Sequence, residues 1–211
     1  MFLIPYCIPL CHDSLLLLAF SLLSDRTYHT PKTGEAFLQV RKSKVPGVSN
    51  FDTGNGLFTI KDIPNGAWVT SYTQTAPFVT ATNEIRASSD YILVFQSRGK
   101  KVQVDGSKCH LGLGRIIQDG SFPLCLAPEK YSAVIKKRIN VKWFLRGEEI
   151  WFKSLRDIKA EEELLTVYSE DNSYWTGEFS QETMSGLRQA FLDEPSDSFE
   201  KAEDIIRHFQ L

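Results

Sequence analysis

Residues 156–168, which read RDIKAEEELLTVY, contain the pattern that decides the fold of this chain. A charged Asp-Ile turn is followed by an apolar run that ends at Tyr168. An earlier segment, residues 54–66 with the sequence GNGLFTIKDIPNG, partly repeats this order, and its apolar continuation ends at Tyr72. Apolar runs bounded by Gly, Asn, Asp and Pro are typical of β-strands. The pattern therefore predicts two strand-forming segments of similar design, far apart in the sequence.

The region between these segments and around them is rich in short strand patterns. Residues 25–35 are polar and contain Pro31 and Gly34, so we expect a linker there. Further strands are expected at Ala36–Val40, Phe58–Ile60, Ala67–Tyr72, Tyr91–Phe95, Lys101–Val104, Asn140–Phe144, Glu149–Ser154 and Leu164–Tyr168. No long helical pattern interrupts them, which predicts a β-rich domain over residues 36–176.

After Trp175 the pattern becomes helical. Apolar residues recur at helical spacing over Ser180–Leu192, and Ser180 is placed to cap the first turn. Residues 193–196 break the pattern, and a second helix is expected to begin near Ser198. Residues 177–211 are therefore expected to form a C-terminal helical extension.

Composition limits the classes of protein that this chain can belong to. Its 211 residues are 42% apolar and 24% charged, which is typical of one globular domain with terminal extensions. The net charge of −2 provides no general attraction to nucleic acid, whose binding depends on many Lys and Arg contacts to phosphate. We expect no direct contact with nucleic acid.

The cysteines and the apolar N-terminus bear on three features: a metal site, a disulfide and secretion. Four cysteines, at positions 7, 11, 109 and 125, have no Cys-x-x-Cys spacing, so no zinc site is expected. A disulfide between Cys109 and Cys125 cannot be judged from their spacing. The apolar run Leu15–Leu23 is too short to cross a bilayer, and no Lys or Arg precedes it as in a signal peptide. Residues 1–35 are expected to be an extension and linker, or in part a mis-joined start of the reading frame, rather than a secretion signal or membrane anchor.

Taken together, the two segments quoted first resemble the two ends of a SET domain, the fold of a large class of protein-lysine methyltransferases. The resemblance covers residues 36–175. It implies a mainly β (β+α) fold of short curled sheets with a C-terminal pseudoknot, which brings Gly54–Gly56, Gln118 and Tyr168 together. It also implies S-adenosylmethionine as the methyl donor.

The resemblance assigns roles to particular residues. Tyr168 corresponds to the tyrosine that faces the reacting lysine amine, and Tyr91 is the next candidate for lining that channel. The donor-binding residues that the resemblance implies are Gly54, Asn55, Gly56, Leu57, Phe58, Arg115, Gln118, Asp119 and Trp175. No metal ligand is expected among them.

The chain departs from the family pattern at several positions. Gln118 and Asp119 replace an asparagine and a histidine, and the asparagine expected next is Asn140, after an insertion of about twenty residues. Gln118 keeps an amide donor and acceptor, whereas a carboxylate at Asp119 cannot donate as imidazole can. Glu161 stands where the family usually has glycine, as does Ser169.

The sequence thus predicts a nuclear or cytoplasmic methyltransferase that acts on lysine side chains of a protein, such as a histone tail. A second hypothesis is a SET-like module that has lost turnover and binds proteins or peptides. A third, motivated only by the apolar N-terminus, is a secreted β-rich binding domain.

Overall fold

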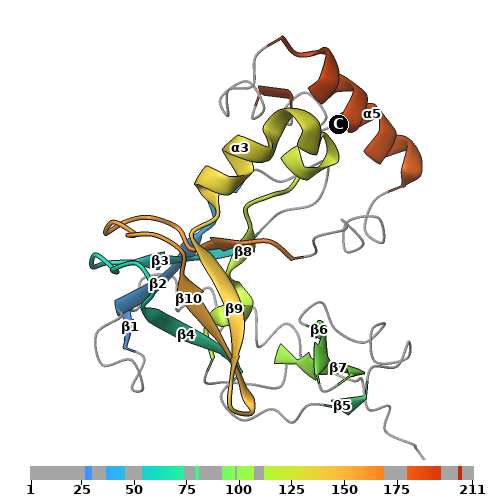
Figure 1. Cartoon of the computed structure of the whole chain (residues 1–211). Helices are drawn as coiled ribbons and strands as arrows, with labels where there is room; N and C mark the ends of the chain where they lie inside the picture. The colour runs from blue at the N-terminus through green and yellow to red at the C-terminus, as the bar shows by residue number, and fades with distance from the viewer. Residues whose placement is uncertain are drawn as a thin grey trace, which may run out of the picture.

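The computed structural model describes residues 27–29, 37–45, 54–73, 79–80, 92–97, 99–106, 112–168, 180–195 and 204–205. Short strands in small sheets make up most of this part of the chain, and helices lie mainly toward its C-terminal side. The expected mainly β (β+α) fold class is confirmed. Figure 1 shows the sheets in the lower part of the view and the two longest helices packed together above them.

The first sheet holds the N-terminal end of the SET-like region. Its order is β1 (Thr27–His29), β2 (Phe37–Lys42) and β3 (Asn55–Thr59), and all pairs are antiparallel. Alternating side chains such as Leu38 and Val40 are buried, as the period of a strand with one apolar face requires. Strand β1 lies within residues 25–35, where a linker was expected; its backbone groups instead pair with β2.

The second sheet is built around a hairpin. Its order is β4 (Trp68–Thr73), β10 (Glu149–Ser154) and β9 (Val141–Arg146), and all pairs are antiparallel. The turn between β9 and β10 contains Gly147 at φ +65°, a left-handed conformation that glycine adopts without steric cost.

Two further sheets complete the β-structure of the described residues. One has the order β5 (Val79–Thr80), β7 (Lys100–Asp105) and β6 (Ile92–Ser97), and the other pairs β8 (Gln118–Asp119) with β11 (Leu165–Thr166) in parallel. The rings of Phe95 and Trp143 lie 5.6 Å apart, which packs β6 against β9. Two isolated antiparallel bridges, Phe58 to Glu163 and Ile63 to Ile158, join the two segments whose sequences resemble each other.

The buried apolar side chains form two clusters. The first fills the space between the sheets and includes Leu57, Val69, Ile117 and Ile158. The second lies beneath the helices and includes Phe122, Leu124, Tyr131, Leu187 and Phe191. It is covered by η3 (Leu124–Leu126), α3 (Pro128–Arg138) and α5 (Gln181–Asp193). A short helix, η2 (Gly114–Ile116), leads into β8.

Most expected elements are present with small shifts at their ends. The structure has β10 at the predicted bounds, and α5 begins after Ser180, whose hydroxyl accepts a hydrogen bond of 3.1 Å from the Thr183 amide as expected for a cap. Helix α3 was not predicted. The apolar run at residues 15–23 lies outside the described residues, as does most of the helix expected from Ser198. In the described part of the chain, no helix is both long and apolar enough for a membrane span.

Candidate active site

The bend before β3 is joined directly to β8, although the two are far apart in the sequence. Gly54 adopts φ +66°, which turns the chain so that its carbonyl accepts a hydrogen bond of 3.0 Å from the Ser43 amide. The side-chain amide of Gln118 donates to the carbonyl of Asn55 at 2.7 Å. The expected proximity of residues 54–56 and Gln118 is therefore present in the structure.

Residues 163–165 lie between these two segments and hold them in place. The amide of Leu164 donates to the carbonyl of Leu57 at 2.7 Å, and Glu163 forms a bridge with Phe58. On the other side, Leu165 pairs in parallel with Gln118. The end of the SET-like region thus inserts between its beginning and its middle.

Tyr168 follows this insertion and faces β8. Its hydroxyl donates to the carbonyl of Ile117 at 2.9 Å, and its backbone amide donates to the carboxylate of Asp119 at 3.3 Å. Its ring also packs against the second apolar cluster. Because the phenol proton is directed to Ile117, the oxygen can act toward an amine only as a hydrogen-bond acceptor.

Asp119 is buried and its carboxylate organises the next turn. One oxygen accepts hydrogen bonds from the amide of Ser121 at 2.7 Å and from its hydroxyl at 2.6 Å. Nearby, burial raises the pKa of the Cys125 thiol to about 12, with a further contribution from the charge of Asp119. This thiol is therefore protonated near neutral pH and is not an activated nucleophile.

Asn140, the asparagine expected after the insertion, holds residues 163–165 in place through its side chain. Its side-chain amide nitrogen donates to the carbonyl of Glu163 at 2.7 Å, and its amide oxygen accepts from the amide of Leu165 at 2.8 Å. Helix α3 occupies the insertion between Asp119 and Asn140. The insertion therefore extends away from the site and returns the chain to it.

Three further residues were predicted to belong to the site: Arg115, Tyr91 and Trp175. The guanidinium of Arg115, on η2, donates to the carbonyl of Gly106 at 3.0 Å, so it holds the end of β7. Tyr91 and Trp175 lie outside the described residues, and the predictions for them stay predictions. The structure thus brings together the residues at 54–58, Gln118, Asp119 and Tyr168.

One residue of this region was assigned no role from the sequence. Glu163 is only 7% exposed, and its carboxylate accepts hydrogen bonds from the Ser43 hydroxyl at 2.6 Å and the Lys44 amide at 2.8 Å. Burial raises the pKa of this carboxyl, although the hydrogen bonds from Ser43 and Lys44 oppose the shift. The available signal was a glutamate placed directly before an apolar strand pattern, since an acidic side chain there is rarely buried without partners.

Within the described ranges, no group of three or more His, Cys, Asp or Glu side chains is arranged to hold a metal ion. Cys7, Cys11 and Cys109 lie outside these ranges, and so does the pairing of Cys109 with Cys125 that the sequence left open.

Comparison with known proteins gives a family match and several similar folds. The SET-domain model matches residues 54–169. The structure of CpSET8 from Cryptosporidium is 19% identical with a TM-score of 0.47, and the alignment covers 65% of this chain and 60% of that chain. No curated protein sequence matches this chain.

Two structures of polycomb repressive complex 2 are also similar. An active complex in the stimulated state gives 22% identity and a TM-score of 0.44 over 66% of this chain and 16% of that chain. The complex from Chaetomium thermophilum gives 22% identity and a TM-score of 0.41 over 63% and 15%. This chain therefore spans less than two thirds of the length of CpSET8 and a small part of the matched chains in the complexes.

The family match and the pairing described above cover the same part of the chain. Residues 54–169 contain the bend at Gly54–Gly56, the parallel pair of β8 and β11, and Tyr168. They are more than half of the 211 residues. The chain belongs to the SET-domain family.

Proposed function

We propose that this protein transfers a methyl group from S-adenosylmethionine to a lysine side chain of a protein. The observation that supports this most directly is the meeting of three distant segments. Gln118 holds the Asn55 carbonyl at 2.7 Å, and the hydroxyl of Tyr168 holds the carbonyl of Ile117, the residue before Gln118, at 2.9 Å. The backbone bend proposed for the donor and the tyrosine proposed for the acceptor are therefore joined through β8.

The residues of the bend suit a donor that is bound mainly through backbone groups. At Gly56 an added Cβ would lie 2.0 Å from Oε1 of Glu163, so the chain has room for backbone only at this point. S-adenosylmethionine would supply a methyl group activated by a positively charged sulfur, which carbonyl oxygens and aromatic faces attract. We propose that residues 54–58, Arg115, Gln118 and Asp119 hold the donor and that Trp175 covers its adenine.

Tyr168 would orient the lysine amine. Its phenol proton is committed to the Ile117 carbonyl, so its oxygen would accept a hydrogen bond from the amine and leave the nitrogen lone pair directed at the methyl group. The reaction requires a neutral amine, whereas a free lysine has a pKa near 10.4 and is charged at neutral pH. A dry aromatic channel disfavours the charged form and so lowers the pKa of the lysine. We propose that Tyr91 forms another wall of this channel.

The proposed substrate is a lysine-containing segment of a protein, and a histone tail is the first to test. In this proposal residues 36–176 form the catalytic domain, residues 1–35 precede it as an extension, and residues 177–211 form a helical extension. The second apolar cluster joins α5 to η3 and contacts Tyr168, which supports a role of the C-terminal helix in shaping the lysine channel. We propose action in the nucleus or cytoplasm.

A specific observation favours the second hypothesis, a SET-like module that binds proteins or peptides without turnover. The amide nitrogen of Gln118 and both carboxylate oxygens of Asp119 already bond groups of the protein itself. Donor binding therefore distinguishes the two hypotheses.

Calorimetric titration with S-adenosylmethionine tests the donor site. The methyltransferase proposal predicts saturable heat with a single-site isotherm, and S-adenosylhomocysteine should compete. Absence of heat at millimolar concentrations of the donor would contradict the methyltransferase proposal and favour the hypothesis of a binding module without turnover. Transfer of a radiolabelled methyl group to a panel of histones and to cell extract would then identify the acceptor class.

A pair of tyrosine variants tests the acceptor site. Tyr168→Phe removes the hydroxyl that would orient the amine, so kcat should fall by about 10²-fold, the scale of a loss of reactive geometry. Tyr131 also has a hydroxyl that donates to a backbone carbonyl, that of Phe191 at 3.4 Å, but it belongs to α3 and its ring packs against α5. Tyr131→Phe is the matched control and should retain activity. Equal activity of both variants would exclude Tyr168 from the reaction.

A further inference from the structure

The carboxylate of Glu163 links the end of β2 to the segment that carries Tyr168. Its Oε1 atom accepts from the Ser43 hydroxyl and its Oε2 atom accepts from the Lys44 amide. The Ser43 amide in turn donates to the carbonyl of Gly54. The buried carboxyl group of Glu163 therefore lies beside both the residues that follow β2 and the residue that precedes β3.

The same carboxylate occupies the space that a side chain at position 56 would need. A Cβ at Gly56 would lie 2.0 Å from Oε1 and 2.8 Å from Cδ of Glu163, and 3.2 Å from the Cα of Ser43. The first two distances are under 3.0 Å, which is shorter than a Cβ atom approaches unbonded atoms in real structures. Glu163 can therefore pack on the bend only because residue 56 is glycine.

We propose that Glu163 is a positioning residue that fixes the backbone at Gly54–Leu57 for the methyl donor, and that Gly56 and Glu163 act as a coupled pair. The proposal rests on the proposed donor site at this bend. Backbone hydrogen bonds from Leu164 and the side chain of Gln118 fix the carbonyls of Leu57 and Asn55. Glu163 adds a carboxylate that lies against Gly56 and bonds Ser43 and Lys44, so it links the bend to the end of β2.

The charged groups around Glu163 show which substitution preserves this contact. Lys44 and Arg138 both favour the ionised carboxylate, whereas burial raises its pKa. A glutamine of the same length can accept from the Lys44 amide through its carbonyl and donate to the Ser43 hydroxyl through its amide. The shape and both hydrogen bonds survive in Glu163→Gln, and they are lost in Glu163→Ala.

Donor affinity of these two variants tests the positioning role. Calorimetry with S-adenosylmethionine should give a dissociation constant about tenfold higher for Glu163→Ala, because both hydrogen bonds that hold the bend are lost. Glu163→Gln should stay within about twofold of the unmodified protein. The control is Glu162→Ala, which removes a neighbouring carboxylate that bonds Arg156 and the Lys159 amide instead. Unchanged affinity in Glu163→Ala, or equal losses in Glu163→Ala and Glu163→Gln, would overturn the proposal.

A double-mutant cycle in unfolding tests the coupled pair without any donor. Gly56→Ala should raise the unfolding equilibrium constant strongly in the unmodified protein, and should raise it about tenfold less in a Glu163→Ala background, because the clash is with the Glu163 side chain. If the effects of the two substitutions on the free energy of unfolding simply add, Gly56 and Glu163 are not coupled. If the cycle shows coupling and the unmodified protein binds no donor, the proposed function fails and the positioning role fails with it. If the unmodified protein binds donor and the cycle is additive, only the present inference fails.

Discussion

Glu161 shows how a single residue at this turn departs from the conformation that its type prefers. It adopts φ +72°, a left-handed conformation that costs about 1–2 kcal/mol for a residue with a Cβ. Its amide donates to the carbonyl of Thr59 at 2.7 Å, so the turn is fixed by the pairing with β3. Its carboxylate forms an ion pair with Arg41, and this contact also lowers the pKa of Glu161.

Substitution of Glu161 separates the two effects. Glu161→Ala loses the ion pair and keeps the strained backbone, whereas Glu161→Gly loses the same ion pair and relieves the strain. Because both variants lose the same ion pair, they differ only in the backbone conformation, and the Gly variant should be about 1 kcal/mol more stable than the Ala variant. Urea unfolding of both variants measures the difference. An Ala variant as stable as the Gly variant would show that the turn is not strained.

The buried carboxyl of Glu163 should give stability a pH dependence of identifiable sign. Its pKa in the folded protein is raised above the ordinary value of 4.5, so its ionisation destabilises the folded state as pH rises from 4.5 through the raised pKa. Glu163→Gln removes this titration. The stability of the Gln variant relative to the unmodified protein should therefore increase over that pH window, as measured by urea unfolding at several pH values.

Glu161 provides the opposite case in the same turn. Arg41 lowers its pKa, so its contribution to stability is present above 4.5 and is lost as pH falls below that value. Glu161→Gln should accordingly lose relative stability above pH 4.5. If both glutamine variants shifted in the same direction, the contrast between the buried and the paired carboxyl would be wrong.

At the scale of secondary-structure elements, Asn140 joins the start of β9 to the segment that leads into β11. It bonds the carbonyl of Glu163 and the amide of Leu165 through its side chain, and its own amide donates to the carbonyl of Leu165 at 3.1 Å. Asn140→Ala leaves a buried carbonyl and a partly buried amide without these partners and should destabilise the protein by about 2–4 kcal/mol.

An exposed amide provides the control for this prediction. Gln189 on α5 donates to Asp193 at 2.7 Å in an exposed position, so Gln189→Ala should change the free energy of unfolding by less than about 0.5 kcal/mol. Both values come from chemical denaturation followed by circular dichroism. Similar small losses for the two variants would show that Asn140 does not hold β9 and β11 together.

The strands and α5 were predictable because their side chains alternate or recur with a clear period. Strand β10 was predicted at its observed bounds, and Ser180 was identified as the cap of α5. Helix α3 was missed because its apolar stripe is short, with Tyr131 buried and only Val134 and Ile135 packed partly buried beside it. Its remaining signals are Pro128 in the first turn and the basic residues 136–138 in the last, which are typical of helix ends.

The meeting of the bend, β8 and Tyr168 was predictable only through the family resemblance. Strands β8 and β11 have two residues each, and a pair of this length leaves no periodic signal in the sequence. Glu163 was missed for a related reason. Its partners, Ser43 and Lys44, lie in a distant segment, and no local pattern indicates which backbone groups a buried carboxylate will meet.

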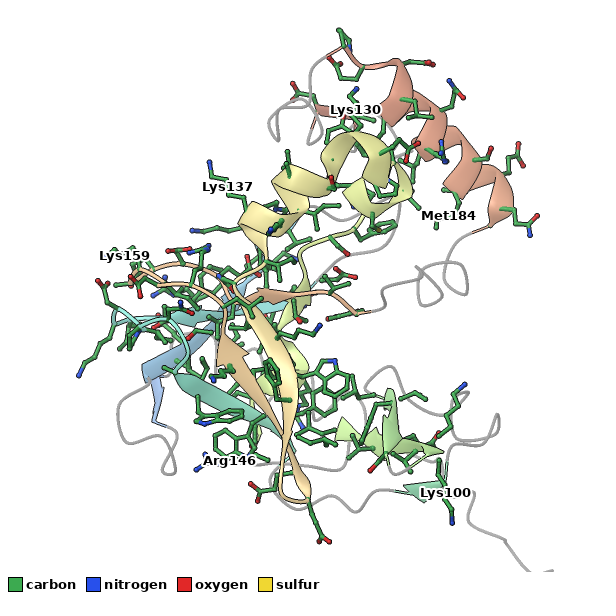
Figure 2. All side chains as sticks on the ribbon, in the orientation of Figure 1. Lys100, Lys130, Lys137, Arg146, Lys159 and Met184 are labelled. Atoms are coloured by element: carbon green, nitrogen blue, oxygen red, sulfur yellow. The ribbon has the colours of Figure 1, made fainter. Side chains whose placement is uncertain are left out.

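At the scale of the whole molecule, the two apolar clusters divide the described residues into a sheet part and a helical part. Figure 2 labels Lys130 at the junction of α3 and α5, where its ammonium donates to the carbonyl of Phe191 at 2.8 Å and also bonds the carbonyl of Glu194. The rings of Tyr131 and Phe191 lie 5.6 Å apart, edge to face. These contacts tie the two helices to each other.

Truncation of Phe191 tests this division. Phe191→Ala should cost about 3–5 kcal/mol in the helical part, because its side chain is fully buried there. Hydrogen exchange should show lost protection in α3 and α5 and retained protection in β9 and β10. The control is Phe144→Ala on β9, whose side chain is 39% exposed and which should change little. Equal loss of protection across both parts would show a single cooperative unit.

The parallel pair of β8 and β11 also determines when the site can form during folding. The chain between these strands includes α3 and the β9–β10 hairpin, whose contacts are local and close quickly. The β8–β11 pair must close the loop around them, which makes it a contact of high sequence separation. We expect it to form after the folding transition state, so substitutions at Gln118 should accelerate unfolding in stopped-flow experiments and leave the refolding rate nearly unchanged. The lifetime of the native protein would then depend on the same residues as its proposed chemistry.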